Sequence, residues 1–412
     1  MTQTLEKEPA CPGADESRLR RTVTTGGPPR GGPARPVDGR LRVEQRPFGS
    51  VRPELWDGLA AANPWSTPFA RWAFHRAWWD AYSGSAHDQT LVVADPASPE
   101  RPVAIVPLMH RHEVEPTDAA NEAHMRHGSG PELTPVEPHA KAIFFGASYH
   151  ADYATVLAAP ADLPAVADAV ADHLMAASTT ADGEMPWDAV DLRRLRCGDP
   201  AADELAAAFG RREMTAGWTL NLEREDVCPV LTLSEVADFD GYLATLGKKD
   251  RHEIRRKLRR AESHGEVRLD ESPDPVRDLD AFIELHQKKW GAKGLFRPTP
   301  GGDASRRFFA RLLELMGRDG TARLTFLTVG GRRIASGVHL ETSDGYLYYN
   351  AGVDPDARDL SPGVLMVARY IERAIATGKR RLDFLRGDES YKYIWGAVDE
   401  PIQRLLVRRA TS

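Results

Sequence analysis

The sequence predicts an α/β protein made of two similar halves, each a mixed sheet covered by helices. The 412-residue chain is long enough for two domains of roughly 100–200 residues. Hydrophobic residues make up 42% of it, which supports well-formed cores, and one order of secondary-structure elements occurs twice. We predict a tail at residues 1–40, a first half at 41–230 and a second half at 231–412.

The elements of the first half follow from their apolar spacing. In chain order we predict a helix, two paired strands, a third strand, a second helix and a last strand. These occupy residues 74–84, 89–96, 101–112, 142–148, 163–177 and 187–195.

The second half shows the same order of elements. The predicted helix, two paired strands, third strand, second helix and last strand occupy residues 308–320, 323–331, 332–342, 346–352, 364–378 and 380–387. The first two strands are joined by Gly330 and Gly331, which favour a tight turn. Repetition of one order predicts two α/β units of similar build.

Composition, charge and hydropathy indicate the kinds of partner and the cellular location to expect. Residues 1–40 are rich in Gly, Pro and Arg, and we interpret them as a disordered tail to which we assign no function. A net charge of −6 and a pI near 6.1 argue against a DNA-binding surface. No apolar run approaches the ~20 residues of a membrane span, and the N-terminus lacks the apolar core of a signal peptide. We predict a cytoplasmic protein without a membrane span.

The loop that connects strand 346–352 to helix 364–378 is the strongest candidate for anion binding. It reads VDPDARDLSPG and leads into a helix start, where free N–H groups and the helix dipole favour phosphate. The corresponding loop of the first half has no glycine near its helix start. The second half is therefore the better candidate for a cofactor, with candidate residues Arg358, Leu360, Ser361, Pro362, Gly363 and Val364.

This loop resembles the pyrophosphate loop of the GNAT acyltransferase superfamily, (Arg or Gln)-x-x-Gly-x-(Gly or Ala). Arg358 takes the first position, Ser361 replaces the first glycine and Gly363 takes the last position. Together with segments 246–262 and 382–396, it resembles tandem-GNAT acyltransferases associated with cellulose and exopolysaccharide biosynthesis, which are related to Fem-type transferases. The resemblance covers the order of elements from Leu41 to about Arg409.

The resemblance implies that an acyl group moves from acyl-CoA, such as acetyl-CoA, to an amine or hydroxyl. The acceptor would be a small or saccharide-linked molecule, and N-acyl transfer is favoured. Such catalysis depends mainly on positioning and on stabilising the oxyanion, and it needs no metal. The histidines and cysteines show no metal-ligand spacing, so we predict no metal site.

Four residues are candidates for the chemistry. Tyr391 and Lys392 match an aromatic-Lys pair of Fem-type enzymes, which implies that Lys392 stabilises an oxyanion or phosphate and Tyr391 positions or protonates the leaving group. Asp388 could take a proton from the acceptor, and His286 could be a general base. The structural alternatives are a surface lysine beside a half-buried tyrosine, and a histidine that only packs.

Four further residues are candidates for substrate binding. Trp290 shares a helix face with His286 and is interpreted as core or pocket wall. Asp383 lies in a strand, where a carboxylate needs a partner. Arg251 and Arg255 lie four residues apart in a basic helix and could hold one phosphate together, although a solvated helix is the alternative.

Two other functions remain open from the sequence. One is a Fem-like transferase that uses aminoacyl-tRNA, although the long helical arm of many such proteins has no counterpart here, which makes tRNA the less favoured partner. The other is a non-catalytic GNAT-fold binding protein that has lost its cofactor site, because Ser361 replaces a glycine.

Overall fold

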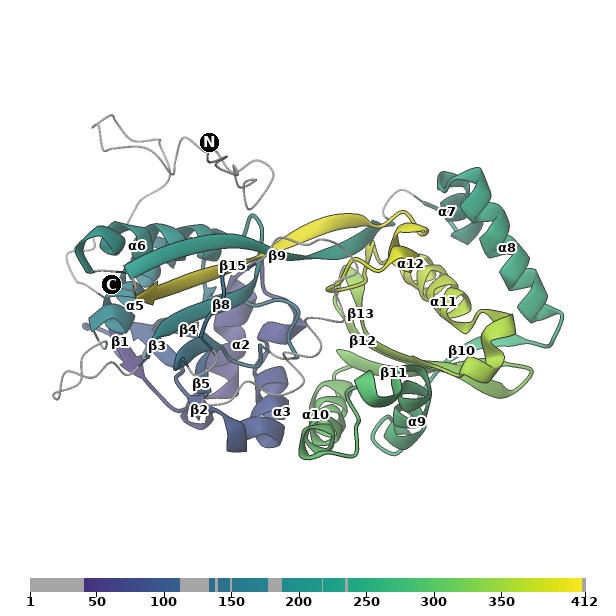
Figure 1. The fold of residues 1–412 in the computed structure, drawn as a ribbon, viewed down its shortest axis with the longest axis horizontal. Coiled ribbons are helices and arrows are strands. Elements are labelled where there is room, and N and C mark those ends of the chain that lie inside the picture. The colour runs from purple at the N-terminus through teal and green to yellow at the C-terminus, as the bar shows by residue number, and fades with distance from the viewer. Residues whose placement is uncertain are drawn as a thin grey trace, which may run out of the picture.

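The computed structural model describes residues 41–111, 133–137, 140–148, 150–176, 187–216, 218–233 and 236–409. The predicted tail at 1–40 lies outside the described residues. The described chain is a mixed α/β protein whose two halves lie side by side (Figure 1). The predicted fold class is confirmed.

The first half contains a small sheet and part of a large one. Its helices and strands are β1 (Arg42–Gln45), α2 (Pro53–Ala62), α3 (Trp72–Tyr82), β2 (His87–Asp88), β3 (Leu91–Ala94), β4 (Pro102–Val106), β5 (Leu108–Arg111), β6 (Ala142–Phe145), β7 (Leu157–Ala158), α5 (Leu163–Ala176), β8 (Ala189–Arg196), α6 (Pro200–Ala216) and β9 (Trp218–Thr232). The single strand predicted at 101–112 is wrong. Pro107 has no N–H to donate, and the chain there passes from β4 in the small sheet to β5 in the large one.

The second half repeats the first from β10 onward. Its helices and strands are α7 (Phe239–Thr245), α8 (Lys248–Glu262), β10 (Val267–Glu271), α9 (Leu279–Trp290), α10 (Pro300–Gly317), β11 (Ala322–Val329), β12 (Arg332–Glu341), β13 (Gly345–Val353), η5 (Pro355–Leu360), α11 (Pro362–Ala376), β14 (Arg381–Asp383), α12 (Ser390–Tyr393) and β15 (Val398–Arg409). The order from β10 to β15 is strand, two helices, three strands, helix, strand, helix, strand. The first half has the same order from β1 to β9 when the two-residue strands β2 and β7 are left out and β4 and β5 are counted together. The predicted internal repeat is confirmed.

The two halves exchange their last strands. The large sheet has the order β10-β11-β12-β13-β14-β9-β15-β8-β6-β5-β2, so β9 of the first half lies beside β14, and β15 of the second half lies beside β8. The register between β9 and β15 runs from Val230 opposite Val398 to Trp218 opposite Arg409. Figure 1 shows these two strands crossing from one half to the other. The predicted boundary at 230 therefore falls inside a shared sheet.

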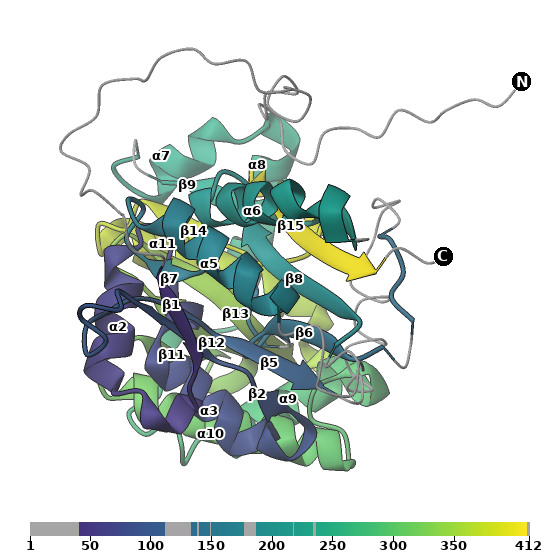
Figure 2. The ribbon, with the colours of Figure 1, turned by 90° about the vertical axis from the view of Figure 1, so that its left-hand side faces the viewer.

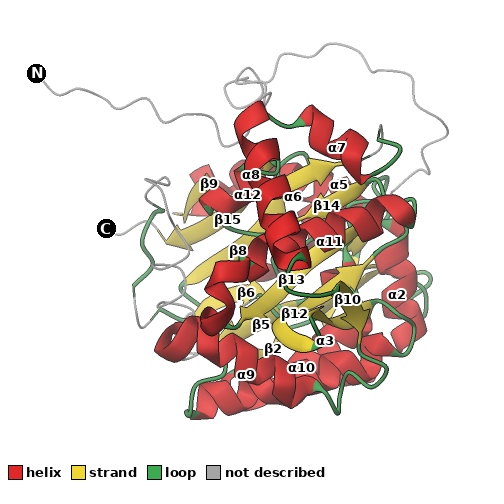
Figure 3. Cartoon of the chain, turned by 90° about the vertical axis from the view of Figure 1, so that its right-hand side faces the viewer, coloured by secondary structure: helices red, strands yellow, loops and turns green. Residues whose placement is uncertain are grey.

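Helices cover both halves and connect them. Figure 2 shows α5 and α6 over the strands of the first half, and Figure 3 shows α8 and α11 on the outer side of the second. Between the halves α3 packs against α10, where Arg311 forms an ion pair with Asp80 at 2.8 Å. The Tyr82 hydroxyl also lies 3.0 Å from Ser305 Oγ.

Candidate functional site

Two parallel strands separate at the centre of the second half. β13 and β14 pair in parallel only from Gly345 and Arg381 to Leu347 and Asp383. Beyond that point β13 continues along β12 as far as Val353, while the chain after β14 bonds to β9 instead. The carboxyl ends of parallel strands that separate in this way are where α/β proteins bind ligands.

The helix that follows β13 starts next to this separation. η5 leads into α11, and Ser361 at the junction has φ 56° and ψ 55°. A serine here thus adopts the left-handed backbone conformation that glycine favours. Pro362 has no N–H, and the described residues provide no acceptor for the N–H of Gly363. A Cβ at Gly363 would meet nothing within 4 Å, so the helix start is open to a ligand.

The other predicted loop residues surround this helix start. Arg358 is exposed, and its guanidinium forms no ion pair within the described part of the chain. Leu360 and Val364 are half-buried and pack against the core that includes Ile254 of α8. The loop therefore offers one free amide and one free cation, with an apolar flank that α8 partly covers.

The first half is closed at the equivalent place. β6 and β8 pair in parallel from Ala142 and Ala189 to Phe144 and Asp191, which corresponds to β13 and β14. Beyond Asp191 the chain that follows β6 returns to β8: the Ala154 N–H donates to the Arg194 carbonyl at 2.9 Å, and Ala154 forms a β-bridge with Leu195. The open arrangement belongs to the second half, as the sequence predicts for cofactor binding.

A group of polar and aromatic side chains surrounds the ends of β13 and β14. We call it the strand-end cluster; it consists of Lys289, Trp290, Tyr348, Glu389, Tyr391 and Lys392. The Trp290 indole N–H donates to the Ala351 carbonyl at 3.2 Å, which fixes the end of α9 against β13. The side chains of Trp290 and Tyr391 are among the most exposed large apolar groups of the described chain, at 39% and 40%. Exposed aromatic rings at strand ends suit substrate binding.

Lys392 is deeply buried, with only 2% exposure. Its ammonium donates to the carbonyls of Leu385, Arg386 and Gly387 at 3.0, 3.0 and 2.8 Å, and it forms an ion pair with Glu389 at 2.8 Å. All three N–H bonds of the ammonium thus have acceptors. Lys392 is therefore not a surface lysine, and its ammonium holds the loop after β14 in shape. Its role in stabilising an oxyanion or phosphate stays a prediction.

Tyr391 and Asp388 flank this loop. The Tyr391 ring lies 6.0 Å from that of Phe384. Desolvation by the surrounding protein, together with the nearby Glu389 carboxylate, raises the pKa of its hydroxyl, which stays protonated at neutral pH. Asp388 is half-buried. Desolvation and the hydrogen bond to Asp399 raise the pKa of the Tyr393 phenol, and the Asp388 carboxylate adds to this effect.

Asp383 has the partners that its burial requires. Its carboxylate accepts hydrogen bonds from the Tyr153 hydroxyl and the Leu385 N–H, both at 2.8 Å, while Arg381 lies 3.6 Å away. Burial raises its pKa, an effect that Arg381 opposes. Asp383 connects the two halves, because Tyr153 comes from the first.

His286 lies in the core rather than in the strand-end cluster. Its ring packs against Phe282 and Phe296, with centroids 6.0 and 4.9 Å away. Burial, aided by the charge of Lys289, lowers the pKa of His286 to about 3, so the ring is neutral at pH 7. A Cβ at Gly352 would lie 2.3 Å from the His286 backbone nitrogen, which shows how closely α9 packs on β13.

Arg251 and Arg255 bind different partners in the structure. Arg255 forms an ion pair with Asp240 at 2.8 Å, and Arg251 donates to the Ala244 carbonyl at 3.2 Å. Both contacts hold α8 against α7. Neither arginine has a recorded contact with the strand-end cluster in the described residues.

Lys289 is the functional candidate that sequence reasoning missed. Its ammonium lies 4.4 Å from the centre of the Trp290 ring. Desolvation lowers the pKa of Lys289 to about 8, although part of the side chain reaches solvent, and the Glu389 carboxylate opposes this shift. The sequence shows only a lysine in a basic helix end, and its electrostatic interaction with Glu389, one hundred positions later, requires the fold.

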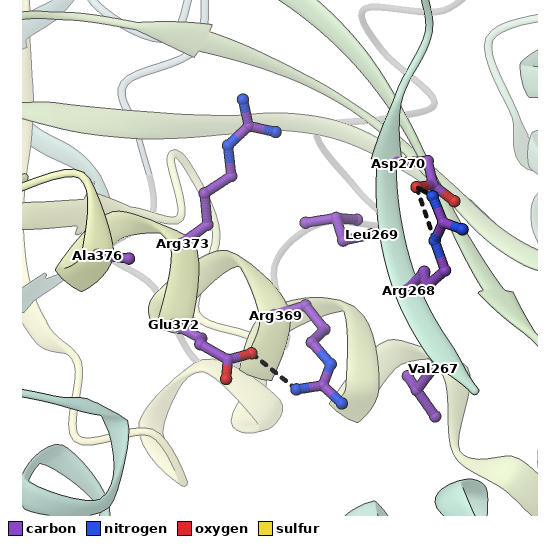
Figure 4. A pocket seen from close by; sticks show the side chains of 8 residues that line it. All are labelled: Val267, Arg268, Leu269, Asp270, Arg369, Glu372, Arg373 and Ala376. Carbon is purple, nitrogen blue, oxygen red and sulfur yellow. Dashed lines mark hydrogen bonds and ion pairs between the residues drawn. The ribbon is translucent and has the colours of Figure 1, made fainter. Parts of the chain in front are cut away.

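A groove of about 490 Å³ lies elsewhere, between β10 and α11 (Figure 4). Its arginines already have carboxylate partners: Arg268 pairs with Asp270 at 2.7 Å, and Arg369 pairs with Glu372 at 2.7 Å. The groove touches the C-terminal half of α11, whereas Ser361 stands at the other end of that helix. We therefore separate it from the candidate site.

The described ranges contain no group of three or more His, Cys, Asp and Glu side chains arranged to hold a metal ion. None of the helices in the same ranges combines the length and hydropathy needed to cross a membrane.

The residues of the candidate site lie in a segment that is similar to a known domain family. The family model for an acetyltransferase (GNAT) domain matches residues 248–393, which include η5, α11 and the whole strand-end cluster. The second half is thus similar to a GNAT acetyltransferase domain over these residues, and the first half repeats its order of elements. The search of curated protein sequences found no match.

A solved structure, that of FemX, has a similar fold over most of the chain. The structure of FemX matches with a TM-score of 0.52 and 11% identity, over 86% of this chain and 96% of FemX. A tandem GNAT protein from the clavulanic acid biosynthesis pathway matches with a TM-score of 0.43 and 12% identity, over 90% of this chain and 99% of that protein. At these identities the similarity concerns the fold alone.

Proposed function

We propose that the second half transfers an acyl group from acyl-CoA to an amine or hydroxyl, with N-acyl transfer to a small or saccharide-linked acceptor favoured. The observation that carries this proposal is the open start of α11, beside two parallel strands that separate. The free Gly363 N–H and the exposed Arg358 would contact the pyrophosphate, and the helix dipole favours that charge. The GNAT domain match over these residues supports it. A CoA thioester would be encountered in the cytoplasm, the location that the sequence predicts.

The strand-end cluster would supply the acceptor side of the reaction. Trp290 and Tyr391 would contact the acceptor, and the Tyr391 phenol, protonated at neutral pH, could give a proton to the leaving thiolate. Lys289, whose pKa is about 8, would take the proton that the attacking amine loses. The loop held by Lys392 would keep these groups in place, since such catalysis depends on positioning.

Calorimetric titration with acetyl-CoA tests the donor site. The intact protein should bind acetyl-CoA saturably, whereas Arg358→Ala should weaken binding about tenfold or more, as expected for a lost charge-assisted contact. Gly363→Leu should abolish binding by covering the free N–H, and it should fold normally because the position is open. Gly58→Leu is the matched control, since Gly58 is also helical with open space around it. Absence of binding to the intact protein at millimolar ligand would refute the proposal.

A Fem-like transfer from aminoacyl-tRNA is the second candidate, favoured by one observation. Helix α8, whose residues are mostly Lys and Arg, packs beside η5 and the start of α11 (Figure 3). Its exposed cations include Lys248, Lys249, Arg259 and Arg260. A long anionic donor could contact this face, and retention of charged tRNA with no binding of acetyl-CoA would favour this candidate.

A further inference from the structure

The loop between β14 and α12 has a strained backbone. Leu385 has φ 59°, a left-handed conformation that is unfavourable for a non-glycine residue and persists only where neighbouring groups hold it. Gly387 has φ 109°, and a Cβ there would lie 2.7 Å from a Glu389 carboxylate oxygen. This conformation aims three successive carbonyls at the Lys392 ammonium. Something outside the loop must hold Leu385.

Asp383 stabilises this conformation of Leu385, and Tyr153 in turn fixes the Asp383 carboxylate. The Leu385 N–H donates to one carboxylate oxygen of Asp383, and the Tyr153 hydroxyl donates to the other. Both side chains are buried, so neither bond has water to replace it. A continuous series of contacts therefore runs from the first half through Asp383 and the loop to Lys392.

The equivalent aspartate of the first half has a different partner. Asp191 occupies in β8 the position of Asp383 in β14, and Arg404 holds it through two hydrogen bonds of 2.6 and 2.8 Å. Asp383 has no such guanidinium fork; its closest guanidinium, that of Arg381, stays at 3.6 Å. The carboxylate of Asp383 is instead used to orient backbone and a neighbouring hydroxyl.

We propose that Tyr153 of the first half is a positioning residue for the acyl-transfer site of the second half, acting through Asp383 on the loop that holds Lys392. This inference rests on the proposed function for its role in catalysis, but the contacts themselves can be tested without substrate. It gives the first half, which is closed at its own strand ends, a part in the chemistry of the second.

Hydrogen exchange followed by mass spectrometry tests the contacts in the full chain. Tyr153→Phe removes one hydroxyl, and amide exchange in the peptide spanning 384–392 should rise about tenfold, the factor that one lost buried hydrogen bond implies. Peptides from α11 and β12 should exchange as before. Tyr82→Phe is the matched control, because the Tyr82 hydroxyl also bridges the halves, to Ser305, and has no recorded contact with this loop. An unchanged loop in Tyr153→Phe, or an equal rise in Tyr82→Phe, would overturn the proposal.

A double variant tests whether the effect of Tyr153 on the loop passes through Asp383. In an Asp383→Ala background, Tyr153→Phe should add no further exchange in the loop, because its effect passes through Asp383. An additive rise would show that Tyr153 acts by another path. If Asp383→Ala does not fold, Asp383→Leu takes its place, since it also removes both carboxylate oxygens but fills the space of the side chain.

Kinetics then separate positioning from stability. With acetyl-CoA as donor, Tyr153→Phe should lower kcat at an unchanged KM for acetyl-CoA, while Tyr82→Phe should leave both unchanged. A loss of kcat that follows only the fraction of unfolded protein would overturn the positioning role. If the intact protein binds no acetyl-CoA, the proposed function fails by itself, and the exchange experiment still decides whether Tyr153 controls the loop.

Discussion

Lys392 shows how far a residue type predicts a role. The resemblance to Fem-type enzymes implies a lysine that stabilises negative charge, and the structure finds that lysine surrounded by three carbonyls and a carboxylate. Sequence identified the position, but the direction of the side chain depends on the loop conformation. Asp383 is the converse case, since its need for a partner was predicted and that partner, Tyr153, comes from the other half.

Lys392→Ala should lower stability more than it would at a surface lysine. The substitution leaves three carbonyls and Glu389 without their cation, and breaking a buried pair costs about 3–5 kcal/mol. Urea unfolding would measure the loss. Lys288→Ala is the control, because its ion pair with Glu284 is exposed and should contribute little to stability. Equal losses in both variants would contradict the structural role of Lys392.

Lys289→Met should alter the pH dependence of acyl transfer. The amine of Lys289, with a pKa of about 8, gains its proton-accepting form as pH rises through that value, so the intact protein should show kcat rising there. The variant should lose this inflection. Lys288→Met should keep it, since its pairing with Glu284 raises the pKa of Lys288. A pH profile that is the same in Lys289→Met and the intact protein would exclude Lys289 as the base.

At the scale of elements, local signals located most helices and strands but not their ends. Helix α10 begins at Pro300 rather than at the predicted 308, because Thr299 accepts a hydrogen bond from the Gly302 N–H and Pro300 suits the first helical position. The last strand is shorter than predicted, since the chain turns at Leu385. Both differences reflect capping and turn chemistry that apolar spacing alone does not report.

The exchanged strands β9 and β15 were not predicted. Their sequences mix charged and apolar residues, as in WTLNLEREDVCPVLT, because part of each strand carries charges that pair inside the protein. Arg404 of β15 is buried and binds Asp191 of β8. Such charges look like a surface pattern until the partner strand is known.

Arg404→Met should destabilise the protein by about 3–5 kcal/mol, because it leaves the buried Asp191 carboxylate without its main cation. Arg211→Met is the control, since the ion pair of Arg211 with Asp168 is exposed and should contribute about 0–1 kcal/mol. Denaturant unfolding of both variants would measure the difference. A change below 1 kcal/mol in Arg404→Met would show that this ion pair does not hold the exchanged strand.

At the scale of the whole molecule, buried histidines should make the fold sensitive to acid. Burial lowers the pKa values of His75, His286 and His339 to about 3. Above pH 6.5 these histidines are neutral in both folded and unfolded chains. Below it the unfolded chain binds protons that the folded chain cannot, so stability falls as pH drops towards 3.

The expected loss between pH 7 and pH 5 is about 2 kcal/mol for each of the three histidines. Urea unfolding at the two pH values would measure it, in a range where most carboxylates still stay ionised. His339→Gln should reduce the dependence by about one third, whereas His252→Gln, at an exposed position, should leave it unchanged. A free energy of unfolding that is flat from pH 7 to pH 5 would refute this account.

The sequence by itself determined the α/β class, the internal repeat and the loop that leads into α11, because apolar periodicity and helix-start residues act over a few neighbouring positions. Only the tertiary structure decided which strands are shared, that the first half is closed by Ala154, and that Lys289, Glu389 and Lys392 meet at one place. Most of those contacts join residues that are distant in the chain, and desolvation at that place lowers the pKa of Lys289. Sequence spacing carries no information about either effect until the fold brings the partners together.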